Sequence, residues 1–312
     1  MNGQTMNLQE LPVYPKDGKM RVALVAPGCW GDNINQTFQL KAIKDRYPEC
    51  SIDVHSSDRY SSAFYNNPYV DRILEYQSHD KNSALHLIHV IPPMLQNRNY
   101  DLILARHPMI YRPWSTSRHP ELGENLILVW AAQMDELGLE YNVPLESTMR
   151  LTSGEIENVK RFIERVPGFN TKRNVLMETH AESGQTFWND GWTKAVCDHL
   201  LTDKNTNVYL SRRDISPDIA KLNNKYGGRV YFVGKLSIRE CAELFNHCQV
   251  FQSISSGLSN ACNTNWCKKD IIWLEAINSH AVSSAPMRKE SKHFWFENNI
   301  ANYINYLKSI GV

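Results

Sequence analysis

The chemistry that this sequence can support begins with an aspartate in a glycine-containing turn. Residues 28–33 read Gly-Cys-Trp-Gly-Asp-Asn and directly follow an apolar run over residues 21–27. Asp32, in this turn, can take the proton from an attacking hydroxyl group if a substrate oxygen comes within hydrogen-bond reach. Aspartate is also one of the residues that most often cap a helix, here the helix expected from Ile34. The residues alone leave both interpretations open and favour the cap.

A second candidate is a turn rich in hydroxyl side chains. Residues 252–260 read Gln-Ser-Ile-Ser-Ser-Gly-Leu-Ser-Asn and join an apolar run to a segment with helical spacing. Backbone N–H groups at the start of a helix bind anions, and a diphosphate is one such anion. A serine-capped turn without a ligand explains the same residues.

Titratable and cationic side chains follow three further apolar runs. Residues 178–188 come after one run and include His180, while Arg212 and Lys235 come after two others. Taken singly, His180 is more often a hydrogen-bonded loop residue, and each cation is an ordinary surface charge. Together they place positive charge and hydrogen-bond donors at one rim, as binding of a diphosphate requires.

These side chains can meet only if the apolar runs are strands of parallel sheets. Short apolar runs bounded by turn residues are typical of strands buried on both faces, and they cover residues 21–27, 51–55, 101–105, 175–179, 208–211, 230–233, 250–252 and 271–274. Helical spacing covers residues 34–46, a segment from 83 that is expected to break at Pro92 and Pro93, and residues 125–137, 188–201, 237–247, from 258, and 299–310. Residues 106–122 contain three prolines and no periodicity, which favours a long surface loop.

The alternation predicts an α/β protein with two Rossmann-like, doubly wound lobes that face a central cleft. The length of 312 residues is about twice that of a typical domain, which agrees with two lobes. We expect an irregular arm over residues 1–19, one Rossmann-like domain over 20–150, a second over 170–298, and a C-terminal helix over 299–312.

Composition and charge limit the class of protein. A formal net charge of +1 gives no overall field that would attract a nucleic acid or a membrane. Seven cysteines without a Cys-x-x-Cys pair argue against a disulfide framework or a zinc site and favour a reducing cytoplasm. The polar first 20 residues do not resemble a signal peptide, and no apolar run reaches the ~18 residues of a membrane span. We therefore expect a cytoplasmic monomer with no bound metal or cofactor.

In their order and spacing, these stretches resemble the heptosyltransferase-like family 9 of glycosyltransferases, bacterial enzymes with the two-lobed GT-B fold. Residues 21–32 and 40–48 are similar to that family's opening strand, Gly-Asp turn and helix ending in Arg-Tyr-Pro. Residues 67–73 read Asn-Pro-Tyr-Val-Asp-Arg-Ile, a sequence usual in the family. Residues 234–240 and 253–260 resemble its Gly-Lys helix start and its donor loop. The similarity extends with gaps over about residues 20–290.

The resemblance implies a glycosyltransferase that is inverting and metal-independent, with a nucleoside-diphosphate sugar as the donor substrate. Asp32 occupies the position of the residue regarded as the family's catalytic base, and residues 256–259 occupy the donor diphosphate position. No Asp-x-Asp pair lies in a loop where a metal-dependent transferase would need one, so positive groups and helix ends would stabilise the leaving group. The expected donor-binding residues are Ser255, Ser256, Gly257, Leu258, Ser259, Lys235, Arg212, His180, Gln185 and, for the ribose, Glu275.

Three of these positions depart from the family pattern. Ser255 stands where the family has aspartate, Asn260 where it has histidine, and Gln185 or Thr186 where it has lysine. Because these positions contact the donor in relatives, the donor sugar need not be a heptose. We favour a UDP-sugar, with an ADP-sugar as the alternative.

The sequence leaves the acceptor open. The family resemblance favours a bacterial surface saccharide such as the lipopolysaccharide core. A hydroxymethylated DNA base, as used by phage-type DNA glycosyltransferases, is the alternative, because basic and aromatic side chains that can contact phosphates and stack on a flipped base gather in the first lobe: Arg98, Arg106, His107, Tyr111, Arg112, Trp114, Arg118 and His119. Of these we expect Arg106, Arg112, Trp114 and Arg118 to bind the acceptor, although a solvated loop explains the same composition.

A non-catalytic nucleotide-sugar-binding module is the third hypothesis for the function of the chain, and the Asp32 turn argues against it.

Overall fold

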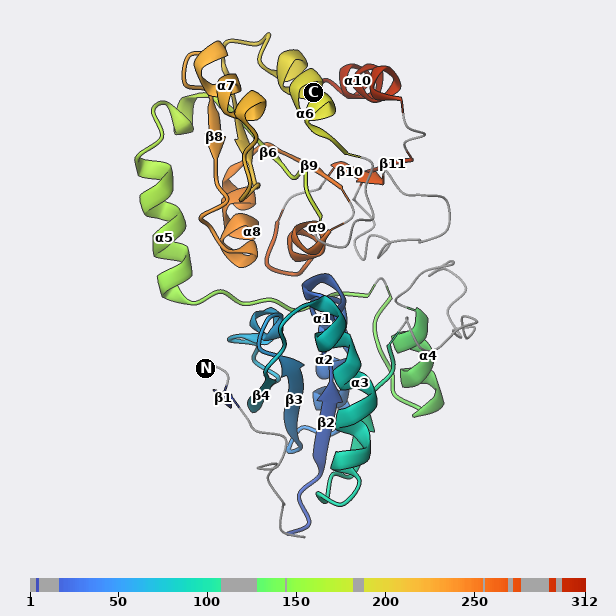
Figure 1. Cartoon of the computed structure of the whole chain (residues 1–312). Coiled ribbons are helices and arrows are strands. Elements are labelled where there is room, and N and C mark those ends of the chain that lie inside the picture. The colour runs from blue at the N-terminus through green and yellow to red at the C-terminus, as the bar shows by residue number, and fades with distance from the viewer. Residues whose placement is uncertain are drawn as a thin grey trace. The chain divides into compact units, whose positions relative to one another are not determined.

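The computed structural model describes most of the chain and divides it into two compact units. The described residues are 4–5, 17–107, 128–143, 145–181, 188–254, 256–268, 272–275, 292–295 and 299–312. The first unit is Met1–Arg150 and the second is Leu151–Val312. Figure 1 shows a parallel sheet with flanking helices in each unit. No helix among the described residues is long and apolar enough to cross a membrane.

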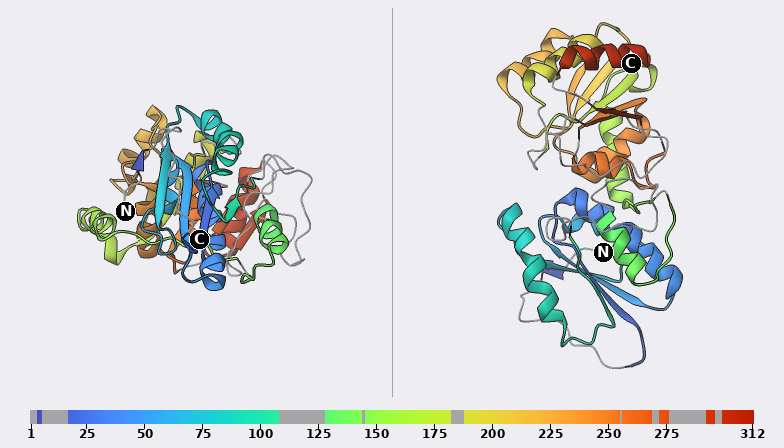
Figure 2. Two further views of the ribbon diagram at one scale, coloured as in Figure 1. Left: turned by 90° about the horizontal axis from the view of Figure 1, so that it is seen from below. Right: turned by 90° about the vertical axis from the view of Figure 1, so that its right-hand side faces the viewer.

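The first unit is built on a five-stranded sheet in the order β1-β4-β3-β2-β5, and every pair of neighbours is parallel. The strands are β1 (Gln4–Thr5), β2 (Arg21–Val25), β3 (Ser51–Ser57), β4 (Arg72–Tyr76) and β5 (Leu102–Leu104). The helices are α1 (Trp30–Asn35), α2 (Thr37–Arg46), α3 (Lys81–Leu95) and α4 (Leu128–Glu136). Helix α3 covers one face of the sheet, and α1, α2 and α4 cover the other (Figure 2).

Helix α3 and the N-terminal arm of the first unit differ from what the sequence predicts. Helix α3 does not break at Pro92 and Pro93 but continues to Leu95, because Ile91 and Leu95 are fully buried against β2 and β4 and hold the last turn in place. Residues Gln4–Thr5 of the expected irregular arm form a strand that pairs with the open edge of β4. An edge strand presents unpaired N–H and C=O groups, which a short segment can satisfy.

The second unit is built on a six-stranded parallel sheet in the order β11-β10-β9-β6-β7-β8. The strands are β6 (Arg173–Met177), β7 (Thr206–Leu210), β8 (Val230–Phe232), β9 (Val250–Ser253), β10 (Ile272–Glu275) and β11 (Lys292–Trp295). The helices are α5 (Ser153–Glu164), α6 (Asp190–Leu200), α7 (Pro217–Lys225), α8 (Ile238–His247), α9 (Gly257–Cys262) and α10 (Ile300–Ser309). Tyr303 and Leu307 place α10 in the core of this unit, together with α6 and α7.

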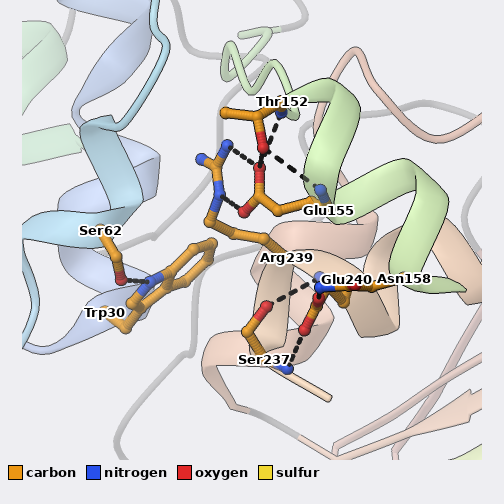
Figure 3. A network of polar contacts seen from close by, with 8 residues as sticks. All are labelled: Trp30, Ser62, Thr152, Glu155, Asn158, Ser237, Arg239 and Glu240. Atoms are coloured by element: carbon orange, nitrogen blue, oxygen red, sulfur yellow. Dashed lines mark hydrogen bonds and ion pairs between the residues drawn. The ribbon is translucent and has the colours of Figure 1, made fainter. Parts of the chain in front are cut away.

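Helices α5 and α8 are joined by an ion pair on the other face of that sheet (Figure 3). Arg239 Nε donates to Glu155 Oε1 at 2.6 Å, and the Arg239 side chain is only 3% exposed. Burial alone would raise the pKa of Glu155, but hydrogen bonds from Arg239 and Thr152 lower it below its ordinary value. Asn158 adds a hydrogen bond to Glu240, which itself caps α8 through Ser237. The first helix of the second unit is thereby fixed to its sheet.

Replacing Glu155 by alanine should destabilise the second unit by about 3 kcal/mol, because Arg239 is left buried without its partner. Urea unfolding monitored by tryptophan fluorescence measures this cost. Lys221→Ala is the matched control, since it removes an ion pair whose side chains are 74% and 81% exposed, and it should change stability by no more than about 0.5 kcal/mol. Equal effects of the two substitutions would contradict the stabilising role of the buried pair.

Candidate active site

Asp32 lies where β2 ends and α1 begins, at the carboxyl edge of the first sheet. The expected helix over residues 34–46 is in fact two helices, and α1 starts at Trp30, four residues earlier than expected. Asp32 is therefore not the N-cap, which is Cys29, but a residue of the first turn whose Oδ2 accepts the Cys29 N–H at 3.1 Å. Its side chain remains 29% exposed. One carboxylate can thus support the helix start and still be reached by a substrate.

The position of the turn is fixed by contacts that involve side chains of α1. The indole Nε1 of Trp30 donates to Ser62 Oγ at 3.0 Å (Figure 3). The buried amide of Asn33 donates to Ser56 Oγ at 3.1 Å, and Ser56 lies on the neighbouring strand β3. These contacts hold α1 against the end of the sheet, so the exposed carboxyl of Asp32 has a defined position.

His107 is the closest titratable neighbour of Asp32 among the described residues. It follows β5, the strand beside β2, and its Nε2 lies 3.7 Å from Asp32 Oδ2 while its side chain is 2% exposed. The ring also contacts the edge of Trp130, whose indole donates to the Arg106 carbonyl at 2.9 Å. A buried imidazole therefore lies beside a partly exposed carboxylate, and a partly exposed carboxylate is a group that can act as a general base.

Gly28 makes this approach possible. A Cβ at this position would lie 2.7 Å from His107 Nε2 and 3.0 Å from Asp32 Cβ. A side chain at this position would therefore force the buried His107 ring to move and would crowd Asp32. The glycine in the turn is thus required by the packing of the two functional groups rather than by an unusual backbone conformation.

In the second unit, a buried glutamate lies beneath the predicted donor loop. Glu178 directly follows β6, and its side chain accepts the Ser256 hydroxyl. Burial raises the pKa of Glu178 to about 8, although hydrogen bonds from Ser256, the Ser259 N–H and Ser253 oppose the change. Near neutral pH this carboxyl is therefore protonated.

The loop itself is closed by its own hydrogen bonds. Ser256 is the N-cap of α9 and accepts the Ser259 N–H, while Ser259 Oγ donates to the Ser256 carbonyl at 2.7 Å. Asn260 donates to the same carbonyl at 2.8 Å. Among the described residues from 256 to 260, Gly257 alone is not buried. Within the described part of the loop, Gly257 is thus the residue that a ligand could reach, while the Ser256 and Ser259 hydroxyls already donate to Glu178 and to the Ser256 carbonyl.

Arg212 and Lys235 follow the neighbouring strands β7 and β8 at the same sheet edge. A Cβ on Gly234 would lie 1.9 Å from the Arg212 carbonyl oxygen, so the two turns touch through their backbones. Arg212 forms an ion pair with Asp190 in the first turn of α6, and hydrogen bonds from Ser216 and Arg212 lower the pKa of that carboxyl. Lys235 is exposed.

The remaining predicted site residues are only partly placed. His180 is exposed just after β6, and Arg106 forms an ion pair with Glu136. The backbone of Glu275 ends β10. Five predicted residues lie outside the described part of the chain: Arg112, Trp114, Arg118, Gln185 and Ser255. Among the described residues, no group of three His, Cys, Asp or Glu side chains is arranged to hold a metal ion.

Sequence reasoning missed two residues of the site. His107 was assigned only to a basic cluster, and Glu178 only to a polar stretch. The signal for both was their place directly after a strand, the same signal that identified Asp32. Strand order cannot be read from the sequence. The sequence alone therefore could not show that β5 lies beside β2 or that β6 lies beside β9.

Two doubly wound α/β units, each with polar side chains at the carboxyl ends of its parallel strands, define the GT-B class of fold that the sequence predicts. Solved structures of this class match nearly the whole chain. A glycosyl transferase family 9 protein from Veillonella parvula DSM 2008 matches with a TM-score of 0.64 and 14% identity, over 96% of this chain and 93% of that chain. The ADP-heptose lipopolysaccharide heptosyltransferase II of E. coli matches with a TM-score of 0.58 and 13% identity, over 93% and 98% of the two chains.

A third similar structure is E. coli heptosyltransferase WaaC with ADP-2-deoxy-2-fluoro heptose, with a TM-score of 0.57 and 14% identity over 93% of this chain and 98% of that chain. No protein-family model and no curated protein sequence matches this chain. At these identities the similarity establishes the fold, and the predicted GT-B architecture is confirmed.

Gly234→Ala should destabilise the second unit by about 2 kcal/mol or more, because the new methyl group meets a backbone carbonyl that cannot move without shifting β7. Thermal unfolding measures the loss. Gly154→Ala provides the control, since its Cβ would have no neighbour closer than 3.9 Å and helix α5 favours alanine over glycine. A Gly234→Ala protein as stable as the wild type would show that the two turns are not in contact.

Glu178→Gln should change how stability depends on pH. The folded state holds the Glu178 proton up to about pH 8, whereas an ordinary glutamate loses it near pH 4.5. The stabilisation of the folded state by this proton is therefore complete below pH 4.5 and is lost as the pH rises towards 8. Between about pH 5.5 and 7.5, the advantage of Glu178→Gln over the wild type should grow by about 1.4 kcal/mol per pH unit at most. Parallel urea-unfolding profiles of the two proteins would contradict the buried, neutral carboxyl.

Proposed function

We propose that this chain is a glycosyltransferase that moves a sugar from a nucleoside-diphosphate sugar to a hydroxyl acceptor. The observation that carries the proposal is the Asp32 site, in which an exposed carboxylate stands in front of the buried His107. Its place in the fold supports the same function, since ligands of open α/β sheets bind beyond the carboxyl ends of the strands. The structural similarity to family 9 glycosyltransferases over most of the chain adds support.

In the proposed reaction, Asp32 takes the proton from the acceptor hydroxyl as its oxygen bonds to the anomeric carbon of the sugar. The bond between that carbon and the diphosphate oxygen breaks at the same time, and the nucleoside diphosphate leaves with the bonding electrons. A single displacement of this kind inverts the configuration at the anomeric carbon. The Gly257 backbone and the exposed Lys235 are proposed to stabilise the charge that develops on the diphosphate, while Arg212 is held by Asp190.

The two units would divide the substrates between them. The first unit, which carries Asp32, would bind the acceptor, and the second, with its buried Glu178 and its exposed Lys235, would bind the donor. The similar structures place ADP-sugars first in a donor screen, because the solved WaaC structure contains an ADP-heptose analogue. UDP-sugars come next, and the departures at Ser255, Asn260 and Gln185 leave the sugar open.

We propose a saccharide rather than DNA as the acceptor, and two contacts in the first unit support this choice. Two members of the basic cluster expected to contact DNA phosphates have other partners, since Arg106 pairs with Glu136 and His107 is buried beside Asp32. A charge that is already paired or buried contributes little to the counterion release that drives DNA binding. A phosphorylated surface saccharide needs fewer cations, so it is the acceptor class that we propose.

The test is a binding screen of ADP- and UDP-sugars by calorimetry, followed by transfer assays on saccharide and hydroxymethylated DNA acceptors side by side. The expected result is transfer to the saccharide with inversion at the anomeric carbon. Transfer to DNA alone would overturn the acceptor proposal. Binding of a nucleotide sugar without transfer or hydrolysis would instead identify a non-catalytic binding module.

Asp32→Asn should lower the transfer rate by about 10²–10⁴-fold, because the amide cannot accept the proton of the acceptor. Donor affinity should stay within a few-fold, and the fold should persist, since the amide oxygen can still accept the Cys29 N–H. Asp45→Asn is the control, as that carboxylate only pairs with the exposed Lys41 on α2. Normal turnover of Asp32→Asn would reduce Asp32 to a support for the helix start.

A further inference from the structure

Glu178 is the buried acid that the proposed reaction does not use. Its backbone N–H donates to the Gln252 carbonyl at 2.9 Å, which ties the end of β6 to β9 immediately before the donor loop. Its side chain is buried, and the Ser256 hydroxyl donates to its Oε2. A long acidic side chain inside a sheet edge costs free energy unless its contacts offset that cost.

Those contacts all come from the donor loop and the strand that leads into it. The hydroxyl of Ser256, the N-cap of α9, donates to the carboxyl, and Ser259 and Ser253, which act to lower its pKa, lie in the same loop and at the end of β9. The Glu178 carboxyl therefore uses the donors through which this loop could hold an anion. The Ser256 hydrogen bond therefore joins the start of the loop, next to the partly exposed Gly257, to this carboxyl.

No nearby positive charge is among the main influences on Glu178. The groups that govern its pKa are its burial and the three hydrogen bonds, while the titratable groups that face it are the Cys241 thiol from α8 and the Cys262 thiol from α9. Burial raises the pKa of both thiols, so both remain neutral. The charged groups near Cys241 are Glu240, which raises the pKa of that thiol, and Arg213, which lowers it. An ionised Glu178 would thus be a buried anion with only neutral partners.

We propose that Glu178 is a positioning residue for the donor loop and that it must carry its proton for the loop to bind a nucleoside diphosphate. The inference rests on the proposed function, because it assigns the 256–259 loop to the donor. When protonated, the carboxyl holds Ser256 and Ser259 without adding charge. When ionised, it places a negative charge directly behind the position of an anionic ligand and competes for the same donors.

Linkage gives the size of the expected effect. If the ionised form does not bind, affinity is constant below the pKa of the free protein, about 8, and falls about tenfold per pH unit above it. ADP does not titrate in this range, since the last ionisation of its phosphate group, at about pH 6, is complete. The uracil ring of UDP begins to ionise near the upper end of the range, so ADP is the reference ligand. If protonation of Glu178 favours binding, then binding must in turn raise the pKa of Glu178. The protein therefore takes up a proton when the diphosphate binds.

The experiment is calorimetric titration of the full chain with ADP and with UDP at about pH 7 and about pH 9. The wild type should bind about tenfold more weakly at the higher pH. Glu178→Gln keeps a neutral side chain of the same shape, so it should bind with near wild-type affinity at pH 7 and lose the pH dependence. Glu243→Gln, which changes a buried carboxyl on α8 that pairs with His247, should leave the pH dependence unchanged.

A second measurement needs no variant. Titrations at about pH 8 in two buffers with different heats of ionisation report the protons taken up on binding, and the wild type should take up about half a proton per diphosphate. Binding without proton uptake, or the same pH dependence in Glu178→Gln and the wild type, would overturn the inference. If neither ADP nor UDP bound at any pH, the proposed function itself would fail.

Discussion

The parallel direction of every strand in both sheets is the constraint on which the rest of the structure depends. Because all strands of a sheet run the same way, the residues that follow them gather at one edge. Asp32 and His107 meet for this reason, although 75 positions separate them in the chain (107 − 32). Glu178 meets Ser256 in the same way across the second sheet. A reversed strand would send its terminal residue to the opposite edge and dismantle the site.

Close packing at these edges explains two glycines. Gly28 is needed because His107 and Asp32 occupy the space of its missing side chain, and Gly234 because the Arg212 carbonyl does. In both places the backbone approaches a functional turn more closely than any other residue would allow. Loop residues are otherwise tolerant of change, so glycines that packing requires mark the turns that must keep their shape.

The sequence predicted the strands well where they are continuously apolar, as in β2 and β5, and it missed the polar first residues Thr206 and Asn207 of β7. It missed β4, because Arg72 and Glu75 interrupt the apolar pattern of a strand whose polar side chains find partners elsewhere in the fold. The sequence predicted a break in α3 at two prolines because the low helix propensity of proline is visible in a sequence. The burial of Leu95, which outweighs that propensity, is not visible there. For the candidate site, the sequence pointed to single residues such as Asp32 and Ser256 but not to His107 and Glu178, which lie beside them.

The partners could not be found because each comes from a distant segment. The imidazole beside Asp32 and the carboxyl beneath Ser256 follow strands whose neighbours are set by tertiary packing alone.

The central proposal is that the second unit binds the diphosphate of a sugar nucleotide at the carboxyl edge of its sheet. A crystal structure with ADP or UDP bound tests it most directly. The account predicts that the diphosphate contacts the Gly257 backbone, with Lys235 near its charge; a nucleotide bound in the first unit, or away from both sheet edges, would contradict it.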